Sequence, residues 1–203
     1  MEFDRVVRRR RMVRNFVPDR PVPPDVVDRL LDLAIRAPSA GFTQGWAFLV
    51  LATAEDRARF WAATSGPDAP DSWLTGMARA PLIIVPHGSR AAYLDRYAEP
   101  DKGWTDRDEA RWPVPYWYLD AGFASLLMLL GVVDAGLGGC FFGIPPARVA
   151  TYREAFDVPD AYTPVGAIAV GYPAPDRRSP SLRRGRRPAA EVAHWGRWGI
   201  SKP

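Results

Sequence analysis

The sequence predicts one domain of mixed α and β structure, in which helices cover a small sheet. Its 203 residues suffice for a single large hydrophobic core. Short apolar runs that are typical of strands alternate with segments whose apolar residues have helical spacing. Because neither an internal repeat nor a linker interrupts this order, we expect residues 1–203 to form one domain.

Four short apolar segments predict the strands of the sheet. The first two are AFLVLA, residues 47–52, and LIIVPH, residues 82–87, and both are typical of buried strands. The third is GGCFFG, residues 138–143, and the fourth is PVGAIAVGY, residues 164–172. The predicted sheet is therefore small.

Three segments of moderate length predict helices. In residues 22–37 the apolar side chains have amphipathic spacing, and Pro38 ends the helix because the residue before a proline leaves helical geometry. Residues 53–64 open with Thr53 and Asp56 at the spacing of a capping box. The segment PPARVATYREAF, residues 145–156, predicts the third helix.

Residues 116–137 predict a long helix that is apolar around most of its girth, which is typical of a central core helix. Its longest apolar run is about 13 residues, whereas a membrane span needs about 20, so we expect no membrane segment. Residues 88–115 are charged and predict irregular structure. The last thirty residues are rich in Pro and Arg, and such a tail either frays or wraps around a partner.

The charge pattern favours a small phosphate ligand over nucleic acid. The formal net charge is +4, and the basic residues, nearly all arginines, gather in two clusters, Arg8–Arg11 and Arg177–Arg187. Two clusters far apart in the chain are suited to converge on one phosphate group. The single cysteine, Cys140, excludes an internal disulfide, and the charged start of the chain is not typical of a secretory signal, so we expect a cytoplasmic protein.

Several kinds of chemistry lack their motifs. His87 and His194 have no Cys, Asp or Glu at ligand spacing, so no metal site is expected. No G-x-S-x-G turn, P-loop or dinucleotide-binding glycine motif occurs. Cys140 lies in an apolar run that is typical of a buried structural thiol. The protein therefore either binds a ligand or takes its chemistry from a cofactor.

Three stretches together resemble the FMN-dependent nitroreductase family. They are RRMVRNF at residues 10–16, APSAGFTQGW at residues 37–46, and a carboxy-terminal series that runs from AGLGGCFFG through PVGAIAVGYPAP to RRGRRPAAEVAHW. The resemblance implies an α+β, three-layer nitroreductase-like fold with a central, mostly antiparallel sheet flanked by helices. It also implies a domain-swapped homodimer with FMN at the interface.

The resemblance gives each stretch a role toward FMN. Arginines near both ends of the chain would bind the phosphate, and Arg14 would lie at the pyrimidine edge, where a cation favours the negative charge of the reduced flavin. The small residues 38–41 would bring backbone against the flavin, and residues 139–143 would pass near N5, where no catalytic side chain is needed. The implied cofactor-binding residues are Arg10, Arg11, Met12, Arg14, Pro38, Ser39, Ala40, Gln44, Gly139, Phe142, Gly143, Arg184 and Arg186.

The sequence departs from the family pattern at three positions. Met12 stands where the family often has Ser, Phe42 where many members have Asn, and Gly45 replaces the proline of Gln-Pro-Trp. The chain is therefore an outlying branch. The aromatic side chains implied for the substrate pocket are Phe42, Trp104, Trp112 and Tyr116, within or beside a lid over residues 88–118. Residues 172–203 would form an arm around the partner subunit.

The function implied by the resemblance is the reduction of an electron-poor organic substrate, such as a nitroaromatic, quinone or enone, with NAD(P)H as the electron donor. The two reactants would use one pocket in turn, in a ping-pong cycle. Two alternatives stay open: a specialised flavin enzyme of a biosynthetic pathway, acting by dehydrogenation or by chemistry like that of dimethylbenzimidazole synthase, and a non-catalytic flavin-storage protein. The donor could also be a deazaflavin.

Overall fold

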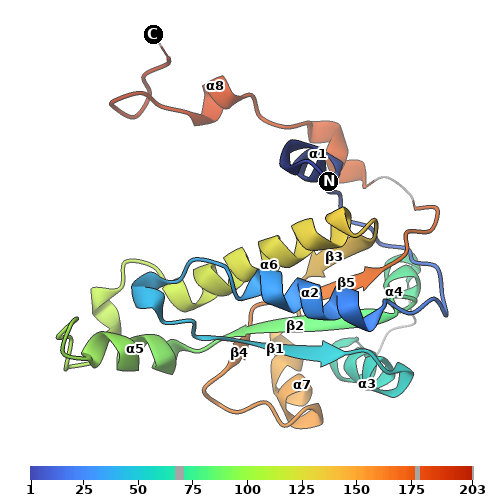
Figure 1. Cartoon of the computed structure of the whole chain (residues 1–203), viewed down its shortest axis with the longest axis horizontal. Coiled ribbons are helices and arrows are strands. Elements are labelled where there is room, and N and C mark those ends of the chain that lie inside the picture. Colours follow the sequence, from blue (N-terminus) through green and yellow to red (C-terminus); the bar gives the residue numbers. More distant parts are fainter. Residues whose placement is uncertain (67–70, 177–178, 203) are drawn as a thin grey trace.

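The computed structural model describes residues 1–66, 71–176 and 179–202, and it arranges them in three layers with an antiparallel sheet in the middle (Figure 1). The strand order is β1-β2-β5-β3, and β4 also pairs with β2. Each of these strand pairs is antiparallel, as predicted. The strands are β1 (Trp46–Leu51), β2 (Leu82–Gly88), β3 (Gly138–Phe142), β4 (Thr163–Pro164) and β5 (Ala167–Gly171).

Helices cover both faces of the sheet (Figure 1). One face carries α2 (Pro24–Ala34) and α6 (Tyr116–Asp134), and the other carries α3 (Ala54–Thr64) and α7 (Val149–Ala155). Strand β2 serves both cores: Ile84 packs with the α2 and α6 side chains, whereas Ile83 and Val85 pack with those of α3 and α7. All seven residues of β2 are buried, which explains its continuous apolar sequence.

The boundaries of several elements differ from the sequence expectation. The capping box is confirmed, because the Thr53 side chain accepts a hydrogen bond from the Asp56 backbone N–H. The expected fourth strand is split into β4 and β5 by residues 165–166, so that both parts pair with β2. The long helix ends at Asp134, three residues earlier than expected.

The expectation of irregular structure across residues 88–115 is partly wrong. Helix α5 (Arg90–Ala98) lies there, capped by the Ser89 side chain. Its larger apolar side chains are Tyr93, Leu94 and Tyr97, and the charged residues beside them obscure this short pattern in the sequence. Two further short helices, α1 (Phe3–Arg9) and α4 (Ser72–Met77), were also not predicted from the sequence.

Helix α6 is half buried and half exposed. By length and composition alone it could cross a membrane, but half of its apolar window is buried inside this chain. The buried side packs with α2 and the sheet. The exposed side carries an apolar stripe of Tyr118, Leu119, Phe123 and Leu126, each 39–47% exposed.

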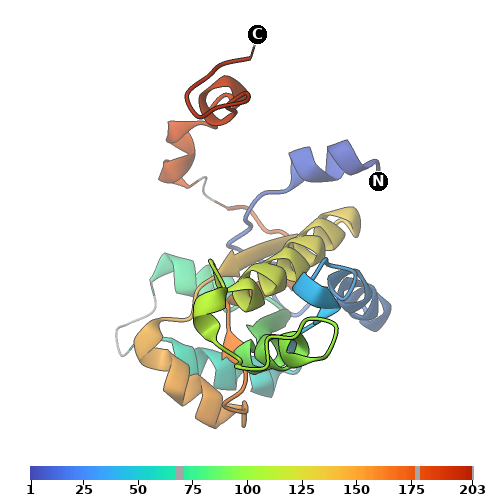
Figure 2. The ribbon, with the colours of Figure 1, turned by 90° about the vertical axis from the view of Figure 1, so that its left-hand side faces the viewer.

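The carboxy-terminal tail stands off the body, on the side where α1 lies (Figures 1 and 2). The amino-terminal end is tied to the body, because the Met1 amino group pairs with Asp134 at the end of α6. The tail contains a short 3₁₀-helix (Pro180–Arg184) and α8 (Ala189–Val192). None of the residues 179–202 is buried, although Leu182, Trp195, Trp198 and Ile200 are large and apolar. The tail therefore gains little stability from its own chain.

Candidate functional site

The turn of residues 38–44 has an unusual backbone. Gly41, Phe42 and Gln44 have φ values of 61°, 54° and 53°, in a region that non-glycine residues rarely adopt. Within the turn, Ser39 Oγ accepts a hydrogen bond of 3.0 Å from Gln44 N–H, and the Thr43 hydroxyl donates one of 2.5 Å to Ala40 C=O. A strained turn persists only where its surroundings determine it.

Helices α5 and α6 supply those surroundings. Asp120 of α6 accepts a hydrogen bond of 2.8 Å from Ala40 N–H, and Arg96 of α5 donates one of 3.0 Å to Gly41 C=O. A Cβ at Gly41 would lie 2.7 Å from the Tyr97 ring, and one at Gly45 would lie 2.6 Å from the Tyr93 ring. This packing explains why Gly45 replaces the family's proline.

The segment Arg10–Arg14 lies beside the start of β3. Met12 forms a parallel bridge with Gly139, and Val13 N–H donates a hydrogen bond of 3.0 Å to Gly139 C=O. Arg14 N–H donates to Asp176 Oδ2 at 2.9 Å, so residue 14 is tied to the segment that leads into the tail. Met12 is partly buried between two parts of the core, where a serine hydroxyl would find mostly apolar neighbours.

A cavity of about 530 Å³ lies between Arg14 and α4. Its lining includes Ser72, Thr75 and a second arginine, Arg79, whose Nη1 donates to Asn15 Oδ1 at 3.3 Å. The sequence reasoning missed Ser72, Thr75 and Arg79, because no motif marks them and only the packing of α4 against residue 14 brings α4 and the residue that follows its cap to the cavity. The lining also includes the Asp176 carboxylate, so the two guanidinium groups leave a net positive charge of one there, which suits a carbonyl-bearing or singly anionic group.

An aromatic hollow of about 430 Å³ adjoins this cavity, and Trp73 lines both. Phe142 stacks on Trp61 with ring centres 5.5 Å apart and meets the edge of Trp73 at 5.6 Å. Gly143 lies at the same hollow. Charged and aromatic surfaces are therefore continuous around Trp73.

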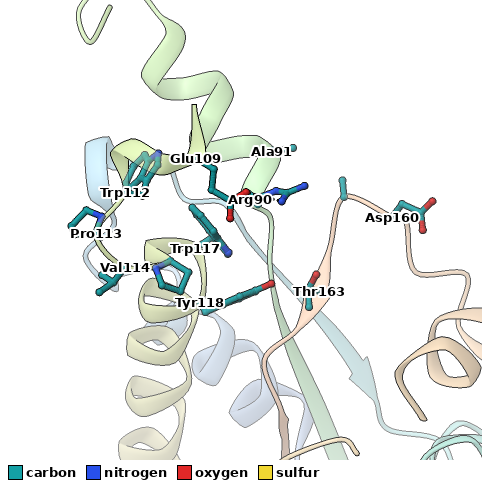
Figure 3. Close-up of a pocket in the computed structure, with 12 residues that line it drawn as sticks. Arg90, Ala91, Glu109, Trp112, Pro113, Val114, Trp117, Tyr118, Asp160 and Thr163 are labelled. Atoms are coloured by element: carbon teal, nitrogen blue, oxygen red, sulfur yellow. Dashed lines mark hydrogen bonds and ion pairs between the residues drawn. The ribbon is translucent and has the colours of Figure 1, made fainter. Parts of the chain in front are cut away.

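A third cavity, of about 590 Å³, opens between the start of α5, the start of α6 and residues 160–163 (Figure 3). An ion pair of 2.8 Å joins Arg90 to Glu109 on its lining. Trp117 is only 4% exposed, and Figure 3 shows its indole nitrogen facing the cavity, near Tyr118 and Thr163. The walls are thus aromatic, and the charges nearest them neutralise each other.

The aromatic residues expected in the substrate pocket do not share one cavity. Trp104 and Tyr116 both pack on Trp112, with their ring centres 5.4 and 5.6 Å from its ring, and of these three only Trp112 also lines the third cavity. Phe42 lies apart from them on the turn and is 77% exposed. The ring centres of Trp112 and Tyr97 lie 4.5 Å apart, and Tyr97 packs against Gly41 of the turn. These two rings therefore lie between the turn and the third cavity.

The chain does not bring the expected cofactor-binding residues together. The turn bonds to Asp120 near the start of α6, whereas Gly139 packs near Leu129 and Val132, about 15 Å further along the helix axis. Arg184 and Arg186 lie on the exposed tail, and the cluster members 177 and 178 fall outside the described residues. The residues are thus divided among the turn, the β3 edge and the tail.

Other titratable groups have structural surroundings. Cys140 is 3% exposed, and burial raises the pKa of its thiol, so the expected buried cysteine is confirmed. His87 Nε2 lies 3.0 Å from the Tyr152 hydroxyl, and burial lowers the pKa of this imidazole. Within residues 1–66, 71–176 and 179–202, no group of three His, Cys, Asp or Glu side chains could hold a metal ion.

Comparison with known proteins relates this arrangement to one family. The nitroreductase family matches residues 7–172. A relative from Methanothermobacter thermautotrophicus, provisionally named NADH dehydrogenase/NAD(P)H nitroreductase, is 28% identical over 178 residues, which cover 86% of this chain and 78% of the relative.

Solved structures share the fold. A provisionally named nitroreductase from Desulfovibrio desulfuricans, in complex with FMN, is 27% identical with a TM-score of 0.70, and the match covers 95% of each chain. Another from Exiguobacterium sibiricum, also in complex with FMN, is 21% identical with a TM-score of 0.72 over 96% of this chain and 97% of the other.

Proposed function

The chain belongs to the nitroreductase family, and we propose that it is an FMN-dependent oxidoreductase that uses NAD(P)H to reduce an electron-poor organic substrate. The observation that carries the proposal is the continuity of the Arg14–Arg79 cavity with the aromatic hollow around Trp73. The flavin ring of FMN has the same two parts, a flat apolar body and a polar pyrimidine edge. The FMN bound in two solved structures of the same fold supports this reading.

The residues present fit FMN at each of its ends. Arg14 and Arg79 would face the polar edge of the ring, and Gly143 would present backbone beside the hollow. Arg10, Arg11, Arg184 and Arg186 would bind the phosphate. When bound, FMN supplies the redox chemistry, accepting a hydride from NAD(P)H and then passing two electrons to the second reactant in a ping-pong cycle. The protein's own work is to bind, orient and set the charge around the ring.

A homodimer would complete the site. The turn lies about 15 Å along α6 from the β3 edge, so a turn from the partner subunit would close the cofactor site of each chain. The apolar stripe of α6 and the large apolar residues of the tail are exposed in the single chain. Burying both against a second copy is favourable. Residues 172–203 would then form the arm that wraps the partner.

The third cavity is the proposed entry for the organic acceptor. Its walls, Trp112 and Trp117, suit a planar uncharged ring, and the inward-facing indole N–H of Trp117 suits a nitro or carbonyl oxygen. Residues 88–118, which hold most of these walls, would act as the lid. The lone buried Cys140 is consistent with work in the cytoplasm.

The test is an absorbance spectrum of purified protein incubated with FMN and freed of excess, followed by anaerobic NADH and, in a separate sample, NADPH. We expect bound flavin that either nucleotide bleaches, and reoxidation by a quinone or nitroaromatic. A protein that retains no flavin contradicts the proposal. Bound flavin that never turns over with any acceptor indicates a storage protein instead.

A further inference from the structure

Asp120 is a buried carboxylate whose hydrogen bonds lead to the turn. It is 3% exposed, and its Oδ2 accepts two hydrogen bonds, one of 2.8 Å from Ala40 N–H and one of 2.7 Å from the Tyr93 hydroxyl. The first bond joins residues 80 positions apart. Asp120 therefore connects the turn to both α5 and α6.

Burying this carboxylate costs free energy of folding unless other groups compensate its charge. Among the described residues no arginine, lysine or histidine forms an ion pair with Asp120. A buried acid without a cation depends on hydrogen-bond donors for compensation. Burial and the bond to Asp120 raise the pKa of the Tyr93 hydroxyl, which therefore keeps its proton and continues to donate.

The turn needs such an anchor. Three of its residues have positive φ, and two of these are not glycine. Its other anchor, Arg96, donates to Gly41 C=O, and Asp101 fixes that guanidinium with two contacts of 2.6 and 2.8 Å. Asp101 is exposed, so water competes for that arrangement, whereas water has little access to Asp120.

We infer that Asp120 is a positioning residue for cofactor binding: it fixes the Ala40 amide and thereby the shape of the turn that meets FMN, and Tyr93 holds its carboxylate in place. The inference rests on the proposed function, in which this turn contacts the cofactor bound to the partner. Asp120 acts through the turn and does not touch the reacting atoms. A loosened turn would weaken FMN binding and leave the sheet intact.

Three variants separate this role from a general effect on folding. Asp120→Ala removes the acceptor, and Asp120→Asn keeps an oxygen there. Ala40→Pro removes the N–H donor and also places the proline Cδ against Asp120 Oδ2, so it breaks the same contact from the side of the turn. Ser39 already has the extended φ of −139° and ψ of 141° that proline demands of the residue before it. Ser125→Ala is the matched control, since Ser125 is also 3% exposed on α6 but bonds only to Ala121 C=O.

The readouts are the FMN dissociation constant of each dimeric apoprotein, its melting temperature, and the exchange rate of the Ala40 amide hydrogen. We expect Asp120→Ala and Ala40→Pro to weaken FMN binding at least about tenfold, the effect of one hydrogen bond to a charged group. Asp120→Asn should restore most of the affinity, and Ser125→Ala should leave it unchanged. The Ala40 amide should exchange slowly in the wild type and fast in Asp120→Ala.

Affinities of Asp120→Ala and Ala40→Pro within twofold of the wild type would overturn the inference. If Asp120→Ala does not fold, an Ala40→Pro affinity within twofold of the wild type still overturns the inference. A wild-type protein that binds no FMN refutes the proposed function, and amide exchange at Ala40 then still decides whether Asp120 holds the turn. Equal affinity losses in Asp120→Asn and Asp120→Ala, each proportional to lost thermal stability, would reduce Asp120 to a structural role.

Discussion

The two ends of α6 differ in how completely this chain builds them. At its start, Asp120, Tyr93 and Arg96 close on the turn of residues 38–44 and leave little of its backbone unsupported. At its far end, the Arg14 cavity is open and the tail stands away from the body. One part of the proposed cofactor site is thus preorganised within the chain, whereas the other would be completed by the proposed dimer.

This difference has a physical origin. The turn carries backbone strain, so it must be held by contacts that exist before the ligand arrives. Arginines near a phosphate need no such fixed packing, because a bidentate contact forms when the anion binds. The exposed apolar residues of the tail are stabilised only when another surface covers them.

Removal of the tail should have the largest effect. A chain that stops after Asp176 loses residues 177–203, and none of the described ones, 179–202, is buried, so the sheet should fold as before. We expect a monomer in sedimentation and FMN binding weaker by about a hundredfold, because phosphate contacts and the partner's turn are lost together. A truncated chain that remains dimeric with unchanged affinity would mean that the open end is complete without its tail.

The next effect is expected at Arg14. Arg14→Ala should weaken FMN binding about tenfold and lower the flavin potential, since the cation that favours the reduced ring is lost. Arg14→Lys should keep most of the potential because it keeps the charge. Arg36→Ala is the control, as Arg36 pairs with Asp32 on the exposed side of α2. Unchanged affinity and potential in Arg14→Ala would refute the role of the open end in cofactor binding.

A smaller and more selective effect is expected in the tail. The double variant Arg184→Ala/Arg186→Ala should weaken FMN binding by about fivefold and leave riboflavin binding unchanged, because riboflavin lacks the phosphate. Arg187→Ala is matched to it, since Arg187 lies beside them but pairs with Glu191. Equal losses for both flavins would show that these arginines act on assembly rather than on the phosphate.

The smallest effect is expected on the stability of the protein at low pH. Burial lowers the pKa of His87 below its ordinary value of 6.5, so the unfolded chain binds a proton more readily than the folded one. Stability should therefore be constant at higher pH and fall as the pH drops below about 6.5, by less than about 1.4 kcal/mol per pH unit. Melting temperatures of the wild type and of His87→Gln test this, and the variant should have the flatter profile.

Local sequence signals predicted most of the fold. The capping pair Thr53 and Asp56, the apolar run of β2 and the apolar girth of α6 each correspond to an element of the structure. These signals depend on residues a few positions apart, which is the range over which helix and strand geometry is set. Helix α5 escaped prediction because its apolar pattern is short, with Tyr93, Leu94 and Tyr97 among charged residues.

The candidate site was predictable in its parts but not in its arrangement. The motifs around Arg14, the turn and Gly143 identified a family that the comparisons confirm. Arg79 lies at the same cavity as Arg14 only because of how α4 packs. Phe42, which was expected in the aromatic pocket, is exposed on the turn, apart from the other three rings. No motif states which surfaces of a chain face one another, so these outcomes depended on packing.

The sequence by itself therefore determined the strands, the longer helices, their order and the family, because each follows from spacing along the chain. The tertiary structure alone decided that the turn is anchored to Asp120 across 80 residues and that the expected cofactor residues divide among three places. Contacts between residues so far apart in the sequence depend on how whole layers pack. The Asp120 carboxylate can accept the Ala40 hydrogen bond only when α6 is packed on the sheet.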